Sequence, residues 1–147
     1  TKMDAPAKVE FKSLTDWTTN ENKNIQYYGG TATYSKTFDF IGDVTKPNFI
    51  NLGRVEKLAA VRINGKALGT VWCYPYQLNI SAALKKGKNN IEVDITNPWW
   101  NRIVGDLQDG VTKKHTWMTF PFEWAKVSPL QPAGLFGPVV IEETPNP

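Results

Sequence analysis

The sequence predicts an all-β fold, an antiparallel β-sandwich, from two local patterns and one spacing. Asn64-Gly65 stands between the apolar segments 60–63 and 67–71, and this dipeptide favours a type I′ hairpin because both turn residues need a positive φ. The residues Lys-Gly-Lys-Asn at 86–89 predict a second hairpin. Short apolar runs recur roughly every ten residues between Gly, Asn and Pro, which is typical of a sandwich or a barrel.

The first elements predicted are an N-terminal edge strand and loop over residues 1–24. Residues 9–11 alternate once in polarity, and residues 16–24 are rich in Thr and Asn, as loops are. A strand is predicted over residues 34–40, whose alternation with period two directs three large side chains toward the core: Tyr34, Phe38 and Phe40. We expect one β-sandwich domain over residues 25–143 and a tail over residues 144–147.

Further strands follow in the order of the chain. They are predicted at residues 49–52, 59–63, 70–72, 76–80 and 91–95, and a closing strand at residues 137–142. One helical turn is expected at residues 81–84 with Ser81 as its cap. The segment 97–131 breaks this rhythm, because it holds four of the six tryptophans and the single histidine. We expect extended surface loops there, with a strand near residues 116–120.

Size and composition exclude several classes of function. A chain of 147 residues can bury a core without disulfides or metals, and its single cysteine, Cys73, is interpreted as a half-buried strand residue. The net charge is only +3, and the cluster Lys85, Lys86 and Lys88 lies on a predicted turn, so no nucleic-acid partner is expected. No apolar run approaches the roughly 20 residues of a membrane span, and the polar start is no signal peptide. We expect a mature piece of a longer protein.

Several motifs occur in a fixed order between residues 27 and 142. They are Tyr34-x-x-x-Phe38, Asn51-Leu52-Gly53, Asn64-Gly65-x-x-Leu68-Gly69, Leu78-x-Ile80, Leu84-x-x-Gly87-x-Asn89, Ile91-x-Val93 and Gly134-Leu135-Phe136-Gly137-Pro138-Val139. In this order they resemble the sugar-binding jelly-roll domain of family 2 glycoside hydrolases. The resemblance is closer to the C-terminal β-sandwich that accompanies the catalytic barrel of family 106 α-L-rhamnosidases. It implies a galactose-binding domain-like jelly roll.

The resemblance also implies a function. In these families the catalytic carboxylates lie on a separate (β/α)8 barrel, so we expect this chain not to be an enzyme on its own but an accessory domain of a glycoside hydrolase. Two roles stay open: binding a plant or host glycan, or packing on the catalytic domain of the parent without binding sugar. An adhesion module of immunoglobulin type would leave the ordered motifs unexplained. The resemblance further implies a bacterial protein that is extracellular or periplasmic.

No cofactor is expected to be required, although a structural calcium ion is often present in such sandwiches. A glycosidase acting alone would need two carboxylates across the sugar. The carboxylates available by position are Asp94 on a predicted strand, Asp106 and Asp109 in a predicted solvated turn, and Glu123. His115 has no Ser, Cys or second His in a recognisable motif, so a structural histidine is expected.

The sharpest functional candidate is the segment 97–102, which follows the strand predicted at 91–95. Its tryptophans could stack on the apolar face of a sugar beside amide and guanidinium donors, but anchors at a domain interface would have the same composition. An aromatic group around Pro75 is a second candidate, of which one or two members are expected in the core. The carbohydrate-binding candidates are Asn97, Trp99, Trp100, Asn101, Arg102, Asp106, Trp72 and Tyr74.

Overall fold

A computed structural model describes residues 3–119 and 123–143 of the chain. These ranges contain nine strands, two α-helices and two 3-10 helices. The elements in chain order are η1 (Trp17–Thr19), α1 (Lys23–Gln26), β1 (Gly30–Phe40), β2 (Asn48–Asn51), β3 (Arg54–Glu56), β4 (Leu58–Ile63), β5 (Lys66–Val71), β6 (Gln77–Asn79), β7 (Gly87–Asn97), α2 (Trp100–Asp106), η2 (Glu123–Val127), β8 (Gly134–Gly137) and β9 (Val140–Glu143).

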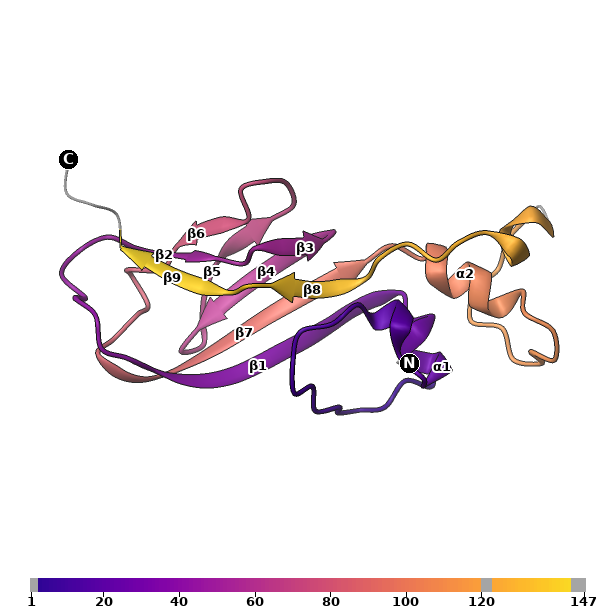
Figure 1. Ribbon diagram of the computed structural model, residues 1–147, viewed down its shortest axis with the longest axis horizontal. Coiled ribbons are helices and arrows are strands. Elements are labelled where there is room, and N and C mark those ends of the chain that lie inside the picture. The colour runs from indigo at the N-terminus through magenta and orange to yellow at the C-terminus, as the bar shows by residue number, and fades with distance from the viewer. Residues whose placement is uncertain (1–2, 120–122, 144–147) are drawn as a thin grey trace.

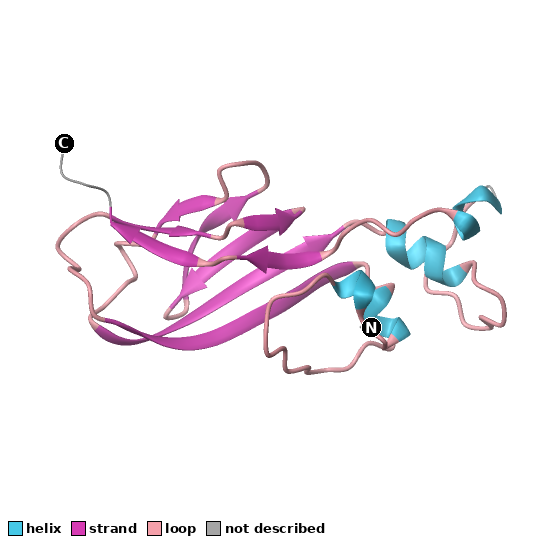
Figure 2. Ribbon diagram, in the orientation of Figure 1, coloured by secondary structure: helices cyan, strands magenta, loops and turns pink. Residues whose placement is uncertain are grey.

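The strands form two layers, as Figures 1 and 2 show. One layer is a four-stranded sheet in the order β1-β7-β4-β5, and the other consists of a three-stranded sheet, β6-β2-β9, and the pair β3-β8. All the strand pairs of these sheets are antiparallel. Buried side chains from both layers, among them Ile50, Leu52, Val61, Ile95 and Leu135, form the core between them. The predicted antiparallel sandwich is confirmed.

The longest pairing joins β1 to β7, from Gly30 opposite Asn97 to Phe40 opposite Gly87. Alternate residues of β1 point inward, and the predicted contacts of Tyr34, Phe38 and Phe40 with the core are confirmed. On the outer face, Arg62 of β4 pairs with Glu92 and Asp94 of β7, which joins neighbouring strands across the solvent side.

The type I′ hairpin predicted at Asn64-Gly65 is confirmed. Both residues have positive φ, 52° and 79°, and the turn joins β4 to β5. The hairpin predicted at residues 86–89 is wrong, because the strand before it, β6, belongs to the other layer. Gly87 instead turns the chain into β7 as it crosses between the layers. The Asn89 side chain holds this turn in place. Its amide oxygen accepts the backbone N–H of Lys85 at 3.0 Å, and its amide nitrogen donates to the backbone carbonyl of Lys85 at 2.7 Å.

The prediction of an N-terminal edge strand within residues 1–24 is also wrong, since residues 3–29 form no strand. A single alternation at residues 9–11 gives one core contact, Phe11 against the Tyr34 ring, which is too little to hold a strand. The Trp17 side chain instead enters the core, with 4% of the residue's surface exposed, and the Trp17 backbone N–H donates to the Ala133 carbonyl at 2.9 Å. The segment before residue 25 therefore packs on the sandwich through Trp17.

The closing strand predicted at residues 137–142 corresponds to β9, which begins at Val140 and pairs with β2. β8 (Gly134–Gly137) pairs with β3 and ends where the predicted strand was expected to begin. Gly137 has a φ of 69° and Pro138 has no N–H to donate, so a continuous ladder cannot pass this point. β3 was not predicted at all. The turn expected at residues 81–84 is present, but the Ser81 hydroxyl does not cap it: it accepts the N–H of Asn48 on β2 at 2.9 Å.

Three further expectations are corrected. Cys73 is exposed on the connection between β5 and β6 rather than half-buried in a strand. Residues 116–119 form no strand, and Phe120 lies outside the described residues. The segment predicted as extended loops also contains two short helices, α2 and η2, which were not predicted. Within the described ranges, none of the helices has the length and apolar character of a membrane-spanning segment.

Candidate functional site

Most of the connection from β7 to β8 forms a lobe with two short helices at one end of the sandwich; we call the described residues of 98–131 the crossover lobe. Figure 1 shows α2 and η2 side by side beyond the ends of the strands. Contacts between residues far apart in the sequence hold the lobe together. The Trp100 ring stacks on the Trp124 ring with centroids 5.5 Å apart. The Asn101 amide exchanges two bonds with the backbone of Gln131, at 2.7 and 2.8 Å.

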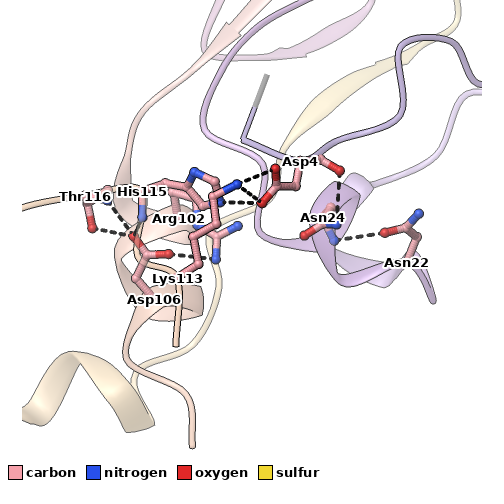
Figure 3. A network of polar contacts seen from close by, with 8 residues as sticks. All are labelled: Asp4, Asn22, Asn24, Arg102, Asp106, Lys113, His115 and Thr116. Atoms are coloured by element: carbon pink, nitrogen blue, oxygen red, sulfur yellow. Dashed lines mark hydrogen bonds and ion pairs between the residues drawn. The ribbon is translucent and has the colours of Figure 1, made fainter. Parts of the chain in front are cut away.

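A buried ion pair lies inside α2. Arg102 and Asp106 are four residues apart, which places them on the same side of the helix, and their Nη2 and Oδ1 atoms are 2.9 Å apart. Their side chains are only 6% and 2% exposed. The other carboxylate oxygen of Asp106 accepts the N–H of His115 at 2.9 Å and both the N–H and hydroxyl of Thr116 at 2.7 Å. Figure 3 shows this carboxylate between the helix and the segment 113–116.

The same segment is held from the other side by the N-terminal residues. Asp4 accepts two bonds from the Lys113 ammonium, at 2.7 and 2.8 Å, and lies 3.2 Å from Nε2 of His115 (Figure 3). The hydrogen bond from Lys113 lowers the pKa of the Asp4 carboxyl below its usual value. Asp4 and Asp106 thus fix the position of the segment that leads to Trp117.

Exposed tryptophans gather on this lobe. Trp117 is 85% exposed, Trp99 is 50% exposed, and Trp124 and Val127 are also exposed. A shallow hollow of about 280 Å³ lies against this segment, lined by Trp99, Ile103, His115, Thr116, Trp117 and Met118. The lobe therefore exposes three tryptophans and Val127 beside charged side chains, among them Asp109, Lys113 and Glu123. The buried side chains of Asn101 and Asp106 bond within the lobe.

The structure divides the residues predicted as a sugar site. Asn97, Asn101, Arg102 and Asp106 are buried, with between 2% and 5% of their surface exposed, and Trp100 is half-buried against Trp124. Trp99 remains exposed. Trp72 and Tyr74 are exposed too, at 72% and 86%, but they lie on the connection between β5 and β6 and not on the lobe. Of the residues predicted as a sugar site, Trp99 is therefore the one that is both on the lobe and exposed to solvent.

The interpretation of Asp106 as a solvated turn carboxylate is wrong, because the residue ends α2 in a buried ion pair. Asp109 is solvated, with its side chain 91% exposed, and pairs with Lys126. Trp117 and Met118 of the hollow were not among the predicted site residues, and their flanking sequence carries no motif that selects them. The described part of the chain gathers no group of three His, Cys, Asp or Glu side chains that could hold a metal ion.

Comparison with known proteins places this geometry in a family. The family model described as glycosyl hydrolase 2 galactose-binding domain-like matches residues 10–123. A putative beta-glucuronidase of Formosa agariphila is 35% identical to the chain over 159 aligned residues. That match covers 91% of this chain and 14% of the relative.

Solved structures agree with this match. The rhamnosidase of Novosphingobium sp. PP1Y superposes with a TM-score of 0.89 and 38% identity, over 95% of this chain and 13% of that structure. A Lactobacillus rhamnosus beta-glucuronidase, at 24% identity and a TM-score of 0.55, covers 65% of this chain and 17% of its own, and it shares the fold. The chain thus spans a small part of the relatives it matches.

The antiparallel sandwich, the ordered turn motifs and the extent of the family match lead to one conclusion. The chain belongs to the glycosyl hydrolase 2 galactose-binding domain-like family, as a short domain that corresponds to a small fraction of larger glycoside hydrolases, whose catalytic domains lie elsewhere.

Proposed function

We propose that the chain is an accessory domain of a rhamnosidase-like glycoside hydrolase and that its crossover lobe packs against the catalytic domain of the parent enzyme. The observation that carries this proposal is the distribution of side chains on the lobe. The amide and charged groups of Asn101, Arg102 and Asp106 bond within the lobe, whereas Trp99 and Trp117 project from it. Exposed aromatic residues of this kind are the usual anchors of protein interfaces.

The arrangement supports docking better than glycan binding at the same place. A sugar site needs several polar groups directed at the ligand beside its aromatic platform. Here the Thr116 hydroxyl and backbone N–H are both directed to Asp106. The hollow, at about 280 Å³, is open and below the roughly 300–1,000 Å³ of pockets that enclose a drug-sized ligand.

A second candidate function is contact of the lobe with one sugar ring of the parent's substrate. It is favoured by the placement of two exposed indoles, Trp99 and Trp117, in the lining of one hollow. A domain that packs beside a catalytic cleft could serve both roles, with the lobe closing one side of the cleft. An extracellular or periplasmic location, as the family resemblance implies, belongs to the same proposal.

The test uses the rest of the parent enzyme, produced without this domain, and the present chain added separately. We expect the two to associate, and we expect the double variant Trp99→Ala/Trp117→Ala to weaken the association by about thirtyfold, as loss of an aromatic anchor worth roughly 2 kcal/mol would. Calorimetric titration of one protein into the other measures this. Trp72→Ala is the matched control, since Trp72 is as exposed as the lobe residues but lies on another connection.

Three outcomes separate the alternatives. No association of the parental proteins would overturn docking. If Trp72→Ala weakens the association and the double variant does not, the interface lies at the connection between β5 and β6 and not on the lobe. Normal association of the double variant, combined with a raised KM of the reassembled enzyme, would favour the sugar-contact role over the docking role.

A further inference from the structure

The Asn64-Gly65 turn of the β4-β5 hairpin contains a reactive pair of groups that docking through the lobe does not use. Asn64 is the one asparagine of the chain that is followed by glycine. Asparagine is among the chemically labile residues of proteins. It reacts when the backbone nitrogen of the next residue attacks its side-chain carbonyl carbon, and a glycine obstructs this approach least because it has no side chain.

Burial does not protect this dipeptide. Both residues are exposed, and a Cβ at Gly65 would meet no described atom within 4 Å apart from its chain neighbours. Water therefore reaches the turn in the folded chain. Any protection of Asn64 has to come from the position in which its side chain is held.

Three hydrogen bonds hold the Asn64 side chain against the segment that leads into β7. Its Nδ2 donates to the Ala83 carbonyl and to Oδ1 of Asn89, both at 2.8 Å. Its Oδ1 accepts the backbone N–H of Asn90 at 3.0 Å, and the backbone N–H of Asn64 donates to the Asn90 carbonyl at 2.9 Å. Both hydrogens of the amide nitrogen are thus engaged, although the residue is exposed.

Asn89 fixes the acceptor that receives the Asn64 amide. It is 1% exposed, and its Oδ1 also accepts the Lys85 N–H at 3.0 Å. Its Nδ2 donates to the carbonyls of Lys85 and Gly87, at 2.7 and 2.8 Å. If the Asn64 side chain rotates toward the Gly65 nitrogen, it leaves these partners, and a buried acceptor loses a donor, which costs free energy.

We propose that Asn64 is a site of spontaneous deamidation that the folded chain keeps closed, so that the reaction proceeds only when the hairpin opens away from Asn89. In the reaction, the Gly65 nitrogen loses its proton and bonds to Cγ of Asn64, the bond from Cγ to Nδ2 breaks, and Nδ2 leaves as ammonia. Water then opens the resulting succinimide ring at either carbonyl, which gives aspartate or isoaspartate. The observed rate is the rate of the open form multiplied by the fraction that is open.

The products do not fit the network that the amide leaves. An aspartate has no amide hydrogens for the Ala83 carbonyl and Oδ1 of Asn89, so its carboxylate would face two acceptors. An isoaspartate adds one backbone atom to a two-residue turn, whose length sets the register of β4 with β5. A chain that has reacted while open therefore cannot rebuild the same hairpin, and the modification records the opening.

The test is incubation of the 147-residue chain at mildly alkaline pH, folded or in urea that unfolds it, followed by mass spectrometry of the peptide that contains Asn64. We expect conversion of Asn64 to be at least about a hundredfold slower in the folded chain, because opening breaks two or more hydrogen bonds. Asn89→Ala should accelerate conversion in the folded chain by at least about tenfold.

Asn90→Ala is the matched control, because the backbone groups that bond Asn64 remain in this variant. Its rate should stay within about twofold of the parental rate. Equal rates in the folded and unfolded parental chain would overturn the proposal. An unchanged rate in folded Asn89→Ala, or an equal acceleration by Asn90→Ala, would overturn it too, since protection would then not come from the Asn89 amide.

A second measurement needs no variant at position 89. Hydrogen exchange of the Asn90 N–H, which bonds Oδ1 of Asn64, gives the open fraction of the parental chain. Conversion much faster than this fraction allows would overturn the gating. Asn64→Asp tests the product directly: we expect a lowered unfolding temperature, and an unchanged one would overturn the claim that the product does not fit. None of these results depends on docking, which is tested with the parent enzyme.

Discussion

The Asp106 carboxylate joins two parts of the crossover lobe. One oxygen pairs with Arg102 within α2, and the other accepts three bonds from His115 and Thr116 of the following segment. Because both side chains of the ion pair are buried, neither can turn to water if its partner is removed. A buried charge that has lost its partner costs far more than an exposed one.

We predict that Asp106→Ala lowers the free energy of unfolding by about 3–5 kcal/mol, since Arg102 would stay buried without its counter-charge. Urea unfolding of the chain, followed by circular dichroism, measures the change. Asp109→Ala is the control: its side chain is 91% exposed, and an exposed pair such as Asp109 with Lys126 contributes less than about 1 kcal/mol. Equal losses in the two variants would contradict this account.

On the outer sheet face, Asp94 gives a stability that depends on pH. Hydrogen bonds from Arg62 above all, and also from Thr33, lower the pKa of the Asp94 carboxyl in the folded chain. A carboxyl whose pKa is lower folded than unfolded stabilises the fold above the unfolded value, about 3.9, and this stabilisation is lost as pH falls through the folded value.

We predict that Asp94→Asn is less stable than the parental chain at about pH 7 and that the difference shrinks toward about pH 3. Arg62→Met removes the main cause of the lowered Asp94 pKa. The difference in stability between this variant and the parental chain should therefore also shrink toward about pH 3. Unfolding temperatures across this range of pH measure both. A difference that stays constant with pH would show that the Asp94 carboxyl is not linked to folding as described.

Part of the residue-level picture can be predicted from sequence and part cannot. The spacing of Arg102 and Asp106 is visible as an i, i+4 pair of opposite charge, a signal for a helix. Their burial is not visible, because it depends on a segment ten residues further on that supplies donors to Asp106. Asn101 was placed on the surface for the same reason: its partner, Gln131, lies thirty residues away.

At the scale of elements, two turns that are separate in sequence form one network. The side-chain amide of Asn64, at the β4-β5 hairpin, donates to the side-chain oxygen Oδ1 of Asn89 at 2.8 Å, and the backbone N–H of Asn90 donates to Oδ1 of Asn64 at 3.0 Å. Asn89 is 1% exposed and also bonds the backbone of Lys85 and Gly87. The two Asn-containing motifs of the sequence therefore stabilise each other at one end of the sheet.

We predict that Asn89→Ala lowers the free energy of unfolding by about 2–3 kcal/mol, because buried backbone groups of the turn would lose their partners. The neighbouring Asn90→Ala is the control, since that side chain is exposed and its backbone bonds remain; its effect should stay within about 0.5 kcal/mol. Chemical denaturation of both variants makes the comparison. A loss as large in Asn90→Ala as in Asn89→Ala would disprove the role assigned to the Asn89 amide.

Elements set by local chemistry were predictable, and elements set by distant partners were not. The β4-β5 hairpin follows from two residues that accept positive φ. β3 is only three residues long and exists because β8, some eighty positions later, pairs with it. Gly137 and Pro138 separate β8 from β9 for a local reason, although the predicted closing strand included both residues.

At the scale of the whole molecule, the sandwich carries two exposed aromatic groups in different places. Trp99 and Trp117 lie on the crossover lobe, where charged side chains such as Lys113 are exposed as well. Trp72 and Tyr74 lie on the connection between β5 and β6, which joins the edges of the two layers. The docking proposed for the lobe therefore leaves the second group exposed.

The N-terminal segment is part of this folding unit through one side chain. Trp17 lies in the core, and its ring stacks on Tyr34 with centroids 6.0 Å apart. Gly134 of β8 makes room for it: a Cβ at that position would lie 2.7 Å from the indole nitrogen. The closing Gly-Leu-Phe-Gly-Pro motif thus packs directly against a residue that precedes the expected domain boundary at residue 25.

We therefore predict that a chain shortened to residues 25–147 is destabilised by about 3–5 kcal/mol, the usual effect of removing a large aromatic side chain from a core. Trp17→Ala in the full chain should reproduce most of this loss, whereas Trp117→Ala, an exposed residue of the same type, should change stability by less than about 0.5 kcal/mol. Calorimetric unfolding of the three proteins decides the matter. If the shortened chain unfolds at the temperature of the full chain, the sandwich is complete from residue 25; if it unfolds early, the cavity left beneath Gly134 shows that the domain begins before Trp17.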